Sequence, residues 1–129
     1  MSREPGAQVV LVADDEPDIV ELLMILLRRG GYEPISVSTG DRALSAAREH
    51  RPDLCVLDGR MPTLHGFEVL RRLREDPETA AIPVLILTAT VDEEREVREH
   101  GIEPDSFMAK PFDADELLAE VARLIDSAI

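Results

Sequence analysis

The sequence contains one cysteine, Cys55, so it can form no internal disulfide and no cluster of cysteine metal ligands. Tryptophan is absent and only four other aromatic residues occur, too few for a surface that stacks nucleic acid bases. No apolar run approaches the roughly 20 residues that a membrane-spanning helix needs. The first residues, Met1 to Gln8, lack the apolar segment of a secretory signal. We therefore expect a cytoplasmic protein, whose lone thiol stays reduced.

Positive charge is scarce as well. Against 14 lysines and arginines stand 27 acidic residues, which gives a formal net charge of -13. Such a surface repels nucleic acid and anionic membranes, so we predict direct binding to neither. A basic protein partner or a metal cation is compatible with this charge. Most of the carboxylates are interpreted as solvated helix faces that keep the protein soluble.

The 129 residues fit one domain with one core. Five short apolar segments occur along the chain, and four of them are apolar almost throughout, as is typical of strands buried on both faces of a parallel sheet. The predicted strands are Val9–Ala13, Ile35–Ser38, Leu54–Leu57, Val84–Thr88 and Ser106–Ala109.

An amphipathic, helix-forming segment follows each predicted strand. The predicted helices begin at Pro17, Asp41, Phe67, Thr90 and Asp113, the last two at pairs with capping-box spacing, Thr90 with Glu93 and Asp113 with Glu116. Strands alternating with helices predict an α/β domain with a five-stranded parallel sheet and helices on both faces. Residues 1–7 are expected to form an N-terminal tail and residues 8–129 the domain.

Polar side chains stand where four of the predicted strands end. In chain order they are Asp14 and Asp15, Asp58, Thr88, and Lys110. Taken singly, each has an ordinary structural explanation, because an aspartate after a strand often caps a helix or stabilises a turn. Ligands of open parallel sheets, however, bind at the carboxyl ends of the strands. We therefore expect all five to meet at one edge of the sheet.

Crowded carboxylates repel one another unless a proton or a cation joins them. Oxygen ligands without histidine or thiolate favour Mg²⁺ or Mn²⁺ over zinc. A lysine adds a charge suited to a phosphoryl group, and a carboxylate can itself accept that group as an acyl phosphate. The cluster therefore predicts phosphoryl chemistry with Mg²⁺.

Four segments together resemble the receiver domain of two-component response regulators, over nearly the whole chain. They are VLVADDEP at 10–17, DGRMP at 58–62 with Gly66, TA at 88–89, and KPF at 110–112. The resemblance implies a flavodoxin-like (βα)₅ fold. It also implies a phosphorelay function, in which a histidine kinase or a histidine phosphotransfer protein phosphorylates the domain.

The resemblance further implies a role for each residue. Asp58 is the phosphoacceptor and a direct Mg²⁺ ligand, as are Asp15 and the backbone carbonyl of Arg60, while Asp14 assists through water. Thr88 and Lys110 contact the phosphoryl group. Phe107 turns inward on activation, and the Lys110–Pro111 bond is cis.

Two features depart from this pattern. Gly59 stands where a large apolar residue often follows the acceptor. The loop before the fifth strand, Ile102 to Asp105, is longer than expected, which predicts a short fourth helix. Because Val97 is the one apolar residue between Asp92 and His100, we expect that helix to shift easily and to repack with Thr88 and Phe107 on phosphorylation.

The residues two positions after the acceptor and the switch threonine are Arg60 and Thr90. They are expected to tune the hydrolysis of the phosphoryl group, although Arg60 could instead be solvated. We expect no enzymatic turnover beyond slow self-dephosphorylation. A homodimer through the fourth helix, fifth strand and fifth helix is compatible with the sequence, as is an unidentified output partner.

Three other functions were weighed. The first is a pseudo-receiver, a binding module that is never phosphorylated, which the complete set of polar residues disfavours. The second is a Mg²⁺-dependent aspartyl phosphohydrolase, which would carry an acid/base carboxylate at the position of Arg60. The third is a flavin-binding domain, which the acidic first loop disfavours. The end of the chain after the fifth helix fits either a single-domain regulator or part of a longer protein.

Overall fold

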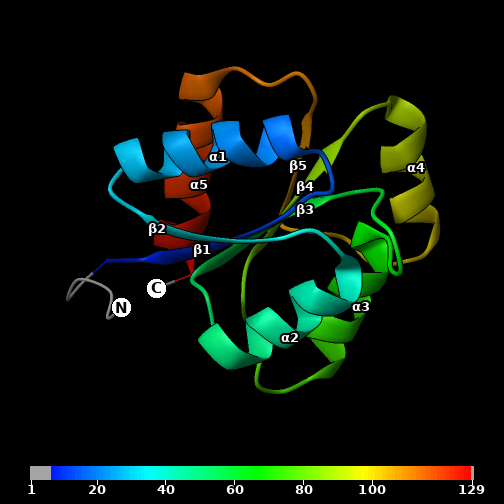
Figure 1. Ribbon diagram of the computed structural model, residues 1–129. Coiled ribbons are helices and arrows are strands. Elements are labelled where there is room, and N and C mark those ends of the chain that lie inside the picture. The colour runs from blue at the N-terminus through cyan, green and yellow to red at the C-terminus, as the bar shows by residue number, and fades with distance from the viewer. Residues whose placement is uncertain (1–6, 129) are drawn as a thin grey trace.

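The computed structural model describes residues 7–128 and contains a five-stranded parallel sheet with the strand order β2-β1-β3-β4-β5 (Figure 1). The strands are β1 (Val9–Ala13), β2 (Glu33–Val37), β3 (Leu54–Asp58), β4 (Val84–Thr88) and β5 (Ser106–Ala109). This order is that of flavodoxin-like domains, so the predicted fold class is confirmed.

The helices cover both faces of the sheet (Figure 1). They are α1 (Pro17–Arg29), α2 (Gly40–His50), α3 (Gly66–Glu75), α4 (Val91–Glu99) and α5 (Ala114–Ser127). α1 and α5 lie on one face, and α2, α3 and α4 lie on the other. None of these helices, within residues 7–128, is long and apolar enough to cross a membrane.

The core consists of two apolar layers, one on each face of the sheet. Successive strand residues point to opposite faces, so Leu11 joins the layer under α2 and α3 while Val10 and Val12 join the layer under α1 and α5. β1, β3 and β4 are buried at every position. These three central strands therefore hold their carboxyl ends in fixed positions. Asp14, Asp58 and Thr88 lie at these ends.

The predicted boundaries needed small corrections; β3 ends at Asp58 instead of Leu57, and α3 begins at Gly66 instead of Phe67. β2 begins at Glu33 and ends at Val37, whereas the prediction was Ile35–Ser38. β2 is an edge strand, where Pro34 is tolerated because its missing N–H costs no ladder bond on the outer side. α2 begins one residue early, at Gly40, where a β-carbon would collide with the backbone carbonyl of Leu64.

The capping predictions for the last two helices were largely confirmed. At α4 the Thr90 hydroxyl accepts the N–H of Glu93, and the Glu93 carboxylate accepts the N–H of Thr90, which completes a capping box. At α5 the Asp113 carboxylate accepts the N–H of Glu116. α4, with nine residues, is the shortest helix of residues 7–128, as the long following loop predicted. The predicted tail lies outside the described residues, apart from Ala7.

Candidate functional site

The first two carboxylates of the site lie at the ends of two neighbouring central strands, β1 and β3. Asp14 directly follows β1, and Asp58 is the last residue of β3. The strand order reverses between β1 and β3, which is where ligands bind in sheets of this kind. Both side chains are buried, Asp14 at 1% and Asp58 at 6% exposure. Two neighbouring buried carboxylates require compensation by cations or protons.

Lys110 supplies one such cation. It follows β5, and its backbone N–H donates to the carbonyl of Thr88 at 2.8 Å. Its Nζ lies 2.9 Å from Asp14 Oδ2 and 3.3 Å from Asp58 Oδ1. The bond that follows it, to Pro111, is cis, as the resemblance implied. The side chain thus bridges both buried carboxylates, from a strand at the edge of the sheet.

Glu16 belongs to this site as well, although it was not among the predicted site residues. Its Oε1 lies 3.1 Å from Lys110 Nζ, and its N–H donates to Asp14 Oδ1 at 2.9 Å. Glu16 occupies the N-cap position of α1 but makes no side-chain capping bond, so its carboxylate is free to turn towards Lys110. Its place directly after the Asp14–Asp15 pair was the available signal.

Asp15 lies apart from this group. Its side chain is exposed and lines, with Asp14, a cavity of about 450 Å³ between α1 and the end of β2. Ser38 and Arg42 also line this cavity. The structure therefore brings Asp14, Asp58 and Lys110 together as predicted, and it places Asp15 beside them on the solvent side.

Burial, together with the like charge of Asp14, raises the pKa of Asp58 to about 7, although Lys110 and the N–H of Arg60 act in the opposite direction. Lys110 shows the reciprocal effect. Burial alone would lower the pKa of its ammonium, but the hydrogen bond to Asp14 and the charge of Asp58 hold that pKa above its usual range. The single ammonium of Lys110 therefore does not compensate the negative charge of the carboxylates around it.

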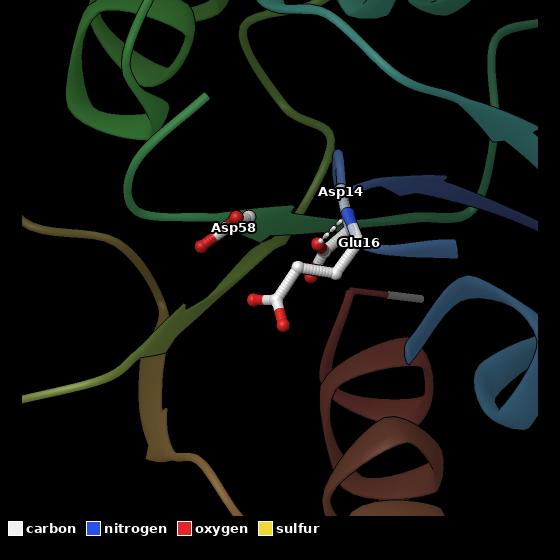
Figure 2. A group of neighbouring side chains, drawn as sticks. All are labelled: Asp14, Glu16 and Asp58. Atoms are coloured by element: carbon white, nitrogen blue, oxygen red, sulfur yellow. Dashed lines mark hydrogen bonds between the residues drawn. The ribbon is translucent and has the colours of Figure 1, made fainter. Parts of the chain in front are cut away.

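The donor set fits a hard divalent cation. Carboxylate oxygens of Asp14, Glu16 and Asp58 lie within 4.8 Å of one another, and all three side chains appear together in Figure 2. Oxygen-only ligands of this kind suit Mg²⁺, which also keeps positions open for phosphate oxygens. The raised pKa of Asp58 marks the position where a cation would relieve repulsion.

The two predicted switch residues lie on β4 and β5. Thr88 ends β4 and is buried at 2% exposure. Phe107 pairs with Ile86 across the two strands and is half-buried. The guanidinium of Arg98, on α4, lies 5.0 Å from the centre of the Phe107 ring, a cation–π contact. α4 therefore contacts the strand that carries the predicted switch aromatic.

Arg60 reaches α4 with its guanidinium, while its side chain remains 61% exposed to solvent. Its Nε lies 2.9 Å from Glu93 Oε1, and a terminal nitrogen lies 3.3 Å from Glu96 Oε2. Glu93 is buried at 5% exposure, which the sequence analysis did not predict. Thr90 serves as the N-cap of α4. Both residues expected to tune hydrolysis are thus tied to the start of this helix.

Comparison with known proteins identifies the family. The sequence profile of the response regulator receiver domain matches residues 10–122. The chain belongs to this family. Receiver domains are signalling domains that accept a phosphoryl group in two-component systems, so the predicted function class is confirmed.

Among curated relatives, this receiver domain resembles the DNA-binding dual master transcriptional regulator RpaA of Synechocystis. The two are 38% identical over 116 residues, which make up 90% of this chain and 48% of RpaA. The chain spans about half the length of the curated relatives it matches.

Two solved structures show the same fold. The receiver domain of the sensor histidine kinase PA1611 from Pseudomonas aeruginosa is 29% identical with a TM-score of 0.87, covering 94% of this chain and 99% of that one. That structure holds a magnesium ion in its active-site cleft. The chemotaxis response regulator CheY4 of Vibrio cholerae is 28% identical with a TM-score of 0.84, covering 92% of this chain and 98% of that one.

Proposed function

We propose that Asp58 is the phosphoacceptor of this receiver domain and that it takes its phosphoryl group from a histidine kinase or a histidine phosphotransfer protein. The observation that carries this assignment is the position of Asp58, buried at the end of β3 and bridged by Lys110 to Asp14. A phosphoryl group on Asp58 would meet the Lys110 ammonium directly. The domain performs no turnover beyond slow loss of that group, and we place it in the cytoplasm.

Mg²⁺ binds, in this proposal, to Asp15, Asp58 and the backbone carbonyl of Arg60, with Asp14 assisting through water. The exposed position of Asp15, next to the buried pair, leaves its carboxylate available from the solvent side. Bound Mg²⁺ would neutralise charge on the transferring phosphoryl oxygens. The side chains hold the acceptor: Lys110 orients the Asp58 carboxylate, and burial excludes water from it.

The signal then passes through Thr88 and Phe107 to the surface of α4, β5 and α5, where an output partner or a second copy of the chain would bind. Thr88 follows Leu87, the partner of Asp58 in the sheet register, and Phe107 lies on the adjacent strand. Hydrogen exchange over residues 90–107, measured with and without a phosphoryl mimic, tests this relay. Equal protection in both forms would contradict it.

Incubation with acetyl phosphate and Mg²⁺, followed by intact mass measurement, tests the acceptor. We expect one phosphoryl addition to the wild type, none to Asp58→Ala, and none to the wild type when EDTA replaces Mg²⁺. Asp18→Ala, which removes an exposed carboxylate of α1, is the matched control and should be labelled normally. Labelling of Asp58→Ala would refute the assignment.

A further inference from the structure

Glu93 is a buried carboxylate for which the proposed function has no use. All nine residues of α4 are described, and the helix buries only Val97 and Glu93. One carboxylate oxygen of Glu93 accepts the backbone N–H groups of Ala89 and Thr90. The other meets Arg60 Nε at 2.9 Å. One of the two residues that α4 buries is therefore charged. The guanidinium that pairs with it, that of Arg60, lies outside α4.

Gly59 provides the space for this carboxylate. A β-carbon at Gly59 would lie 3.6 Å from Glu93 Oε1 and 3.4 Å from the carbonyl of Leu87. A longer apolar side chain there would press hydrocarbon against a charged oxygen, which is costly when that oxygen is buried. The glycine that departs from the usual receiver pattern is therefore matched to Glu93.

Arg60 connects the acceptor to α4. Its backbone N–H donates to Asp58 Oδ1 at 3.3 Å, and its guanidinium binds Glu93 and Glu96. Arg60 therefore contacts the acceptor carboxylate through its main chain and α4 through its side chain. This connection is separate from the one through Thr88 and Phe107.

We propose that Arg60 and Glu93 form an electrostatic latch that holds α4 against the acceptor loop, and that a phosphoryl group on Asp58 opens the latch. This proposal rests on the proposed function of Asp58. Phosphorylation replaces the single negative charge of the ionised Asp58 carboxylate by nearly two and places three phosphate oxygens two residues away from Arg60. Guanidinium binds phosphate oxygens well, so the phosphoryl group competes with Glu93 for it.

The latch has a thermodynamic consequence. If a phosphoryl mimic must take Arg60 from Glu93 in order to bind, removal of the Glu93 charge with Arg60 in place makes the mimic bind more tightly. Because Arg60 is 61% exposed in its side chain, the gain is modest, roughly two- to fivefold in the dissociation constant. The gain of Glu93→Gln should vanish when Arg60 is replaced as well, because the guanidinium released from Glu93 is its source.

The experiment measures the affinity of the full chain for beryllium fluoride in the presence of Mg²⁺. The variants are Glu93→Gln, Arg60→Ala and the double variant. Glutamine still accepts hydrogen bonds at the start of the helix, so the cap is kept and only the charge is lost. Asp92→Asn is the matched control, because it removes a charge from the same turn at a side chain that is 85% exposed. We expect tighter binding in Glu93→Gln and wild-type binding in the control. Arg60→Ala and the double variant should show no tightening, because both lack the guanidinium that would bind the mimic.

Hydrogen exchange of the unmodified proteins gives a second readout. Glu93→Gln and Arg60→Ala should raise exchange over residues 91–99, whereas Asp92→Asn should not. A Glu93→Gln variant that matches the control in both measurements would overturn the latch while leaving the acceptor assignment intact. A wild-type chain that binds no beryllium fluoride and accepts no phosphoryl group would instead overturn the proposed function, and the opening of the latch with it.

Discussion

Asp58 and Glu93 are equally buried, at 6% and 5% exposure, but their surroundings differ. Glu93 receives two backbone N–H groups and a guanidinium. Asp58 receives the N–H of Arg60 and the ammonium of Lys110, each at 3.3 Å, and has Asp14 as a neighbour of like charge. A buried carboxylate with well-placed partners stabilises the fold, whereas one that lacks them costs free energy. Because Asp58 lacks such partners, its carboxylate remains available to a cation and a phosphoryl group.

The largest expected effect comes from neutralising Asp58. Because its pKa is raised from 3.8 to about 7 in the folded chain, the folded state holds more protons than the unfolded state between these values, and stability falls as pH rises through that range. Asp58→Asn should therefore raise the free energy of unfolding at pH 8 by roughly 2–4 kcal/mol in EDTA. Urea denaturation measures this difference.

The gain should vanish below about pH 4, where the wild-type carboxyl is protonated in both states. Mg²⁺ should stabilise the wild type at pH 8 and leave Asp58→Asn nearly unchanged, since the ion binds the ionised carboxylate. A gain that is the same at pH 4 and pH 8 would show that charge repulsion is not its cause.

Glu93 should respond in the opposite direction. Glu93→Ala leaves the N–H groups of Ala89 and Thr90 without their carboxylate partner, and Arg60 without its shorter ion pair. We expect a loss of about 1–3 kcal/mol in the free energy of unfolding at pH 8. Glu99→Ala removes an exposed carboxylate from the last turn of the same helix and should have little effect. An equal loss in both variants would remove the contrast between the two carboxylates.

Thr90 tests the other half of the capping box. Thr90→Ala removes the hydroxyl that accepts the N–H of Glu93, at an expected cost of about 1 kcal/mol. Thr90→Ser keeps that hydroxyl and should retain most of the stability. Thermal unfolding of both variants separates the capping bond from the loss of the methyl group, because serine lacks only the latter.

The smallest effect is expected at Glu94, whose pair with Arg98 spans one turn of α4 at 2.9 Å. Glu94→Gln should cost about 0.3–0.5 kcal/mol at low salt. The difference should disappear in about 1 M NaCl, where charges on the surface are screened. Persistence of the cost at high salt would show that this carboxylate contributes through packing.

Most of the fold could be predicted because each central strand is a short apolar run that ends in a polar residue. The same pattern located Asp14, Asp58, Thr88 and Lys110, since strand ends in a parallel sheet share an edge. Glu93 was recognised as part of a cap, but its burial depends on Gly59 and Arg60, more than thirty residues earlier. No local pattern carries that information.

Glu16 was missed for a different reason. A glutamate directly before a proline at the start of a helix has a sufficient local explanation, and its contact with Lys110 spans 94 positions. Asp15, by contrast, was predicted from its neighbour, and its side chain turns to the solvent. Consecutive residues of a loop can point in different directions, whereas alternate residues of a strand point to the same face. Adjacency in the sequence therefore could not show which of Asp15 and Glu16 turns towards Lys110.

The matched pair of Gly59 and Glu93 restricts how this sequence can diverge. A β-carbon at position 59 would lie 3.6 Å from Glu93 Oε1, so a longer side chain there would share its space with the buried carboxylate. Substitution at position 59 therefore depends on which residue stands at position 93, and chimeras that exchange the α4 segment between receiver domains should be more stable when the residue after the acceptor is exchanged with it.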